Sequence, residues 1–194
     1  MKTCLNLPEH YVPILEVDLQ KNKKLAIIVN VAAILIGIVM IAAAIPFVPM
    51  TALFDLSQGM GAYLLRFLVL IVGTVGYIYG HELVHGICMK HYSNVRPHYG
   101  FAGIYAYAGS DAYFDKKSYI IIALAPVILW GVVFAVILPF VPKAWFWVVY
   151  FLEVFNISGA AGDLYVTCKF LGLPADILVK DIGVSMMVYA AEKK

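Results

Sequence analysis

The sequence HELVH at residues 81–85 combines residue types and a spacing that can do chemistry. Two histidines four residues apart lie on one face of a helix, so the imidazoles of His81 and His85 can bind one metal ion. Glu82, beside the first histidine, can act as a base on a water molecule that the metal activates. Zinc accepts histidine and carboxylate ligands and has no redox chemistry. The pattern therefore predicts a zinc site with Glu82 as general base.

The composition indicates what kind of protein carries this motif. The chain has 194 residues, of which 63% are hydrophobic and only 13% charged, and a water-soluble fold of this size could not bury so much apolar surface. The net charge of +2 comes without a dense basic patch, which argues against nucleic-acid binding. Three cysteines without a CxxC pair indicate reduced thiols. We therefore expect an all-α integral membrane protein that lies in the lipid bilayer.

Four apolar stretches are long enough to cross the hydrocarbon core as helices, at about 1.5 Å per residue and about 30 Å of thickness. They cover residues 25–45, 61–90, 119–141 and 144–170. Lysine and arginine gather in the leader 1–24, the loop 91–118 and the tail 171–194, whereas Lys143 alone lies between the third and fourth stretches. The positive-inside rule then places both termini and the loop in the cytoplasm. We expect one multi-pass domain over residues 1–194 in the cell membrane, with Arg66 snorkelling to the outer interface.

Chance and simple packing are the alternatives to a metal site at residues 81–85. With 5 His and 12 Asp+Glu in the chain, roughly 0.01 such patterns are expected by chance. The other alternative is a pair of packed histidines beside a glutamate that snorkels. Ionisable groups at membrane depth are costly and usually functional, which favours the metal site.

The depth of residues in the helices narrows the choice of a third metal ligand. His85 and His81 precede Lys90 by five and nine residues, so they lie about 8 and 14 Å in from that charge. Asp163 precedes Lys169 by six residues in a helix that runs the same way, so it lies about 9 Å in. The carboxylate of Asp163 is therefore expected at the level of the two imidazoles.

Three other side chains remain alternatives for this ligand position. Glu153 lies about 24 Å in from Lys169, and the membrane would have to deform for it to reach the metal. Cys88 lies on the His85 face one turn further along, and Cys168 lies near the end of the fourth stretch. Either thiolate could bind zinc, although ordinary packing explains both.

Two further segments carry open interpretations. Residues 95–113, rich in Gly and Tyr with an IYAYAG alternation, predict strands or a re-entrant hairpin. We therefore expect four transmembrane helices with a small cytosolic β element. This segment is either an interfacial ribbon or an edge strand that pairs with an extended substrate, and VSMMVYAA of the tail is a candidate to pair with it. Asn156 lies on one helix face with Gly159 and Asp163, so its amide could bind a substrate carbonyl or oxyanion, or make an interhelical hydrogen bond.

Several segments together resemble a family of small multi-pass membrane proteins, the zincin peptidases, which are distant relatives of the site-2 protease class of intramembrane metalloproteases. The segments are the leader LPEHYVPILEVDLQKNKK, HELVHG, IALAP, NISGAAGDLY, and a Lys-Asp-x-Gly tail followed by VSMMVYAA. In site-2 proteases the third ligand is an aspartate in an LDG motif of a later span. The resemblance implies that role for Asp163, although in GDLY the glycine precedes the aspartate.

These observations predict a zinc-dependent endopeptidase in the membrane. His81, His85 and Asp163 would bind Zn²⁺, and Glu82 would deprotonate the attacking water. The expected partner is a membrane protein or peptide cut near the cytoplasmic face, by intramembrane proteolysis of the site-2 protease type. The alternative is a non-catalytic metal-binding or scaffold protein. Glu82 discriminates between the two, because a purely structural metal site needs ligands and no base.

Overall fold

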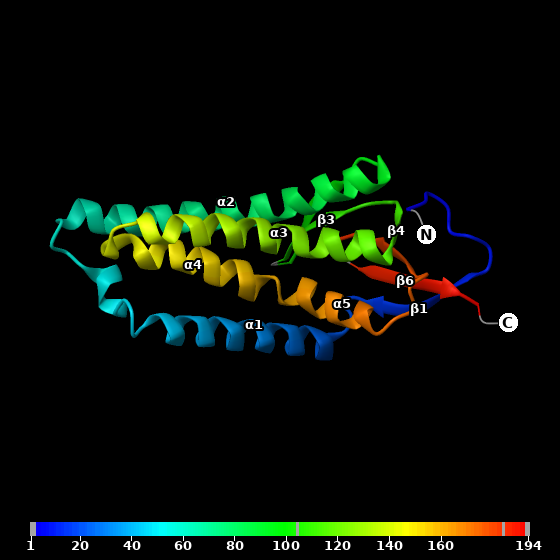
Figure 1. The fold of residues 1–194 in the computed structure, drawn as a ribbon, viewed down its shortest axis with the longest axis horizontal. Helices are drawn as coiled ribbons and strands as arrows, with labels where there is room; N and C mark the ends of the chain where they lie inside the picture. Colours follow the sequence, from blue (N-terminus) through cyan, green and yellow to red (C-terminus); the bar gives the residue numbers. More distant parts are fainter. Residues whose placement is uncertain (1–2, 104, 184, 193–194) are drawn as a thin grey trace. The chain divides into compact units, whose positions relative to one another are not determined.

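The computed structural model describes residues 3–103, 105–183 and 185–192 (Figure 1). Four helical segments are long and apolar enough to cross a membrane, judged by length and composition. They span Lys23–Ala44, Met60–Ser93, Lys116–Phe140 and Lys143–Leu171. The four helices expected from the apolar stretches are thus confirmed, with ends shifted by a few residues.

The chain divides into two compact units, each built from separate pieces of sequence. The first contains Met1–Val29, Gly80–Pro126 and Gly162–Lys194, and the second contains Asn30–Tyr79 and Val127–Ala161. The described residues form five α-helices: α1 Lys23–Ala44, α2 Met60–Ser93, α3 Lys116–Ile137, α4 Lys143–Gly159 and α5 Ala161–Leu171. Two short 3₁₀ segments, η1 Met50–Phe54 and η2 Leu138–Phe140, follow α1 and α3.

The fourth apolar stretch is broken into two helices at Ala160, which caps the C-terminus of α4 with φ −81° and ψ 15°. The sequence around the break is Gly-Ala-Ala-Gly, from Gly159 to Gly162. Glycine lowers the stability of a helix interior by about 1 kcal/mol relative to alanine, so the helix is weakest there. As a result, Asp163 lies in the first turn of α5 rather than in the middle of one long helix.

The second unit has an apolar core around η1. Trp147 and Val148 of α4 are fully buried against Ala44, Val48 and Leu53. Arg66 of α2 is also fully buried in this unit, and its guanidinium donates a hydrogen bond to the carbonyl of Asp55, just after η1. The expectation that Arg66 snorkels to the interface is therefore wrong, because the segment after η1 supplies it with a partner inside the fold.

The first unit contains the β structure. A four-stranded antiparallel sheet has the order β1-β6-β5-β4, and β2 and β3 form a separate two-stranded sheet. The strands are β1 Tyr11–Val17, β2 His98–Ala102, β3 Tyr105–Gly109, β4 Tyr113–Asp115, β5 Leu178–Asp181 and β6 Met186–Ala191. The hairpin expected within residues 95–113 is confirmed as β2–β3, although Ile104 of its IYAYAG sequence lies outside the described residues.

The tail strand has different partners from those expected. β6 pairs with β1 of the leader, from Tyr11↔Ala191 to Val17↔Met186, and with β5, instead of with the hairpin β2–β3 (Figure 1). A turn at Gly183, with φ of 87°, joins β5 to β6 and makes them neighbours. The apolar leader strand then covers the other edge of β6. Val184 of VSMMVYAA and the charged termini Lys2, Lys193 and Lys194 lie outside the described residues.

Candidate metal centre

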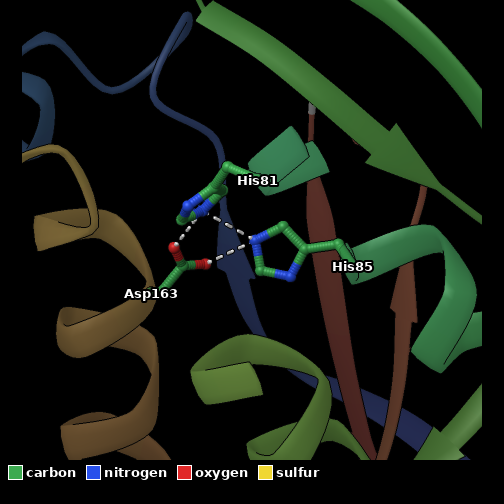
Figure 2. A group of neighbouring side chains, drawn as sticks. All are labelled: His81, His85 and Asp163. Carbon is green, nitrogen blue, oxygen red and sulfur yellow. Dashed lines mark hydrogen bonds and ion pairs between the residues drawn. The ribbon is translucent and has the colours of Figure 1, made fainter. Parts of the chain in front are cut away.

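Two helices of the first unit bring together three side chains that could hold a metal ion (Figure 2). His81 and His85 lie one turn apart on α2, and their Nε2 atoms are 3.1 Å apart. The carboxylate of Asp163, from α5, lies 3.4 Å from His81 Nε2 through Oδ2 and 3.6 Å from His85 Nε2 through Oδ1. Both imidazoles are buried, whereas the Asp163 side chain is 26% exposed.

The donor atoms are spaced as ligands of one small metal ion would be. In tetrahedral zinc sites the bonds are about 2.0–2.1 Å long, which separates neighbouring ligand atoms by about 3.3 Å. The separations of 3.1, 3.4 and 3.6 Å lie around this value, with a different oxygen of Asp163 nearest to each imidazole. With one ligand atom taken from each residue, the three atoms lie within 4.8 Å of one another. Three protein ligands leave a fourth position for water or substrate, which is the arrangement of catalytic zinc sites. The residues therefore fit a zinc ion.

A carbonyl group of α3 orients His85 toward this position. The Nδ1–H of His85 donates a hydrogen bond of 2.9 Å to the backbone oxygen of Ile122, which leaves the lone pair on Nε2 for a metal. In a regular helix the Ile122 carbonyl would accept a hydrogen bond from the residue four positions later. That residue is Pro126, inside α3, and proline has no N–H. Pro126 therefore leaves the Ile122 carbonyl free to accept from His85.

The hairpin β2–β3 contacts Glu82, the next residue after the first histidine. The backbone N–H of Ala108 donates a hydrogen bond to the Glu82 carboxylate. Tyr99, the cross-strand partner of Ala108, lies against Gly86, where an added Cβ would be 2.6 Å from its Cζ. Partial burial and the negative charge of Glu82 raise the pKa of the Tyr99 hydroxyl above its usual range. Glu82 thus lies against the hairpin, within a turn of both histidines.

Sequence reasoning did not identify Ile122, Ala108 or Tyr99. Two of the three had a signal in the sequence. A proline inside an apolar helix frees the carbonyl four residues before it, which points to Ile122. A glycine in the middle of a helix permits close approach by another segment, which Gly86 of HELVHG provides for Tyr99. Ala108 acts through its backbone N–H, for which the side-chain sequence carries no signal.

The other candidates for the third ligand do not join this group. Among the residues that the structure describes, the cluster of three or more His, Cys, Asp or Glu side chains able to share a metal consists of His81, His85 and Asp163. Neither Cys88 nor Cys168 belongs to it.

Glu153 and Asn156 contact each other in the second unit. The Nδ2 of Asn156 donates to the Val127 carbonyl at 3.0 Å and to Glu153 Oε2 at 3.3 Å. Its Oδ1 accepts a hydrogen bond of 3.2 Å from the Tyr77 hydroxyl. Both N–H donors of this fully buried amide are therefore engaged. These contacts favour the interhelical hydrogen bond over the oxyanion interpretation of Asn156.

Comparison with known proteins agrees with the chemistry of the site. A family model described as "Putative zincin peptidase" matches residues 73–178, more than half of the chain. This region includes His81, Glu82, His85 and Asp163. No curated protein and no solved structure gives a significant match. The family suggests a metallopeptidase with zinc as its cofactor, and the chain belongs to this zincin peptidase family.

Proposed function

We propose that the protein is a zinc-dependent endopeptidase embedded in the membrane, which hydrolyses peptide bonds of membrane-associated or transmembrane substrates near the cytoplasmic face. The observation that carries this proposal is the spacing of the nitrogen and oxygen donors of His81, His85 and Asp163. A carboxylate that is not needed as a ligand, Glu82, lies next to them. A purely structural metal site would have no use for that carboxylate.

The surface of the helices supports insertion in a membrane. Helix α1 is apolar on all sides and has no acidic residue in its first turn. Its side chains Leu35, Ile38 and Val39 are nevertheless 56%, 57% and 67% exposed, so protein does not cover them. A helix of this kind requires an apolar solvent if it is not buried in protein. The distribution of lysine and arginine supports cytoplasmic termini and a cytoplasmic loop 91–118.

In this proposal, each residue around the site has a separate role in hydrolysis. Zinc, when bound, supplies a Lewis acid that lowers the pKa of water to about 7 and polarises a carbonyl. Glu82 accepts the proton of the attacking water and returns it to the leaving amine, a role worth typically 10²- to 10⁴-fold in rate. The Ala108 N–H fixes the orientation of the Glu82 carboxylate. The Ile122 carbonyl fixes the tautomer and ring orientation of His85.

The hairpin β2–β3 is our candidate for the surface that holds the substrate. Each of its strands has one neighbouring strand in its sheet as far as the structure describes the chain, so each has an edge beside which no further strand pairs. An extended peptide can add to such an edge through main-chain hydrogen bonds. A peptide bond inside a helix is shielded, so a transmembrane substrate must first unwind beside the site. This favours substrates with helix-breaking residues near the cytoplasmic face.

Metal analysis tests the proposal first. Protein purified in detergent without chelators should contain about one zinc per chain, because the described residues offer one ligand cluster. Replacing His81 or His85 with alanine should lower that content. A wild-type protein free of metal would refute the peptidase proposal and also the alternative of a metal-binding scaffold.

A further inference from the structure

The turn Lys180-Asp181-Ile182-Gly183, the Lys-Asp-x-Gly motif of the tail, has no role in the chemistry above, yet it is tied to the site in two ways. The Asp181 carboxylate accepts a 2.8 Å hydrogen bond from the Gly183 N–H through Oδ1. The N–H of Ile182 donates to the carbonyl of Ser185 at 3.1 Å. Gly183 has a φ of 87°, which side chains other than glycine rarely adopt. The turn therefore has a defined conformation.

The first connection runs through the Asp181 side chain to α3. Its Oδ2 accepts a hydrogen bond from the hydroxyl of Tyr119, which is 4% exposed. Burial raises the pKa of the Asp181 carboxyl, and the hydrogen bonds from Tyr119 and Gly183 only partly offset this. Tyr119 lies on α3 three residues before Ile122, the residue whose carbonyl holds His85. Asp181 thus anchors the turn of α3 that orients a predicted metal ligand.

The second connection runs through the backbone of the turn to the hairpin. The Asp181 carbonyl accepts a 2.7 Å hydrogen bond from the N–H of Ser110, the residue after β3. The Tyr107 ring lies against Gly183, where an added Cβ would be 2.7 Å from its Cε2. Ala108, whose N–H holds Glu82, lies between Tyr107 and Ser110 in the chain. The same turn therefore also anchors the strand that contacts the general base.

We propose that Asp181 is a positioning residue of the metal centre, which holds α3 and the hairpin where they orient His85 and Glu82. The inference rests on the proposed function. Asp181→Asn leaves one side-chain oxygen where the carboxylate serves two donors, so the buried Tyr119 hydroxyl and the Gly183 N–H cannot both keep their acceptor. A buried donor that loses its acceptor is costly enough to make the Tyr119 turn of α3 shift. The shift moves the Ile122 carbonyl, and His85 loses part of its orientation.

The test uses Asp181→Asn and Tyr119→Phe in the full-length protein, with Asp111→Asn as a matched control. Asp111 lies 4.0 Å from Lys180, beside the same strand, but its side chain is 80% exposed. We would measure zinc affinity by competition with a chelator, and the visible absorption of the cobalt-substituted protein, which reports ligand geometry without any substrate. Loss of groups that orient metal ligands typically costs 10- to 100-fold in affinity. We expect about tenfold from Asp181→Asn, with a changed cobalt spectrum, and no change from Asp111→Asn.

The effects of Asp181→Asn and Tyr119→Phe on zinc affinity should not add, because both variants disrupt the same hydrogen bond. Tyr119→Phe removes the hydroxyl and should weaken zinc binding similarly, and the double variant should be no weaker than Asp181→Asn alone. A folded Asp181→Asn protein with wild-type zinc affinity and cobalt spectrum would overturn the inference and leave the proposed function intact. If Asp181→Asn fails to fold, wild-type zinc affinity and cobalt spectrum in Tyr119→Phe would likewise overturn the inference. A wild-type chain that binds no zinc would overturn the proposed function and this inference with it.

Discussion

Replacing Pro126 with alanine tests why His85 faces the metal position. The Ile122 carbonyl accepts the Nδ1–H of His85 at 2.9 Å, and it is free to do so because residue 126 has no N–H. Alanine would supply that N–H and a regular hydrogen bond within α3. The helix and the imidazole would then compete for one carbonyl oxygen.

The expected effects on stability and on metal binding have opposite signs. Proline costs about 3 kcal/mol in a helix interior relative to alanine, so Pro126→Ala should stabilise α3 by up to that amount. Zinc affinity should fall, since a group that orients a ligand is worth 10- to 100-fold. A carbonyl oxygen has two lone pairs and can accept two hydrogen bonds. We therefore expect zinc affinity to fall by the lower end of this range, about tenfold, which corresponds to about 1.4 kcal/mol of binding free energy.

The assay compares zinc affinity and thermal stability of Pro126→Ala with those of Pro139→Ala. Pro139 lies in η2, beyond the end of α3 at Ile137, so this control changes a proline next to the same helix without affecting the Ile122 carbonyl. The account predicts weaker zinc binding for Pro126→Ala and wild-type binding for Pro139→Ala. Wild-type zinc affinity in a folded and more stable Pro126→Ala protein would refute the role of the free carbonyl.

Three further predictions concern the third ligand, the hairpin and the topology. Asp163→Asn keeps the size of the side chain but removes its charge, so zinc content and cleavage should both fall while the protein still folds; unchanged zinc content would exclude Asp163 as a ligand. Gly86→Ala would place a Cβ 2.8 Å from Cε1 of Tyr99, so the ring must move; zinc content should stay constant while cleavage falls, and unchanged cleavage would exclude a role for this contact. A reporter fused after Lys194 should score as cytoplasmic, and an external score would contradict the charge-based orientation.

Much of the helical architecture follows from local sequence. Apolar stretches longer than a membrane is thick can form little else, which is why the four predicted helices are present. The spacing of His81 and His85 fixes their common face before any tertiary contact is known. Depth along a helix then sufficed to select Asp163, whose carboxylate lies beside both imidazoles.

Pairings between distant segments were harder to predict. The leader strand β1 pairs with β6 of the tail across most of the chain, and short apolar strands carry little information about which partner they take. The burial of Arg66 depends on a carbonyl after η1, and a backbone acceptor is not visible in the sequence around the arginine. The break at Ala160 had a signal in its flanking glycines, but glycine is common in membrane helices and does not fix a break.

The most direct test of the central claim is the replacement of Glu82 with glutamine, measured by zinc content and by the new N-termini that appear in membranes of cells expressing each protein. Glutamine keeps the shape of the side chain but cannot accept the proton of the attacking water. The account predicts zinc content and thermal stability near wild type, and the loss of nearly all cleavage products. A Glu82→Gln protein that binds zinc and produces the same new N-termini as the wild type would contradict the assignment as a peptidase.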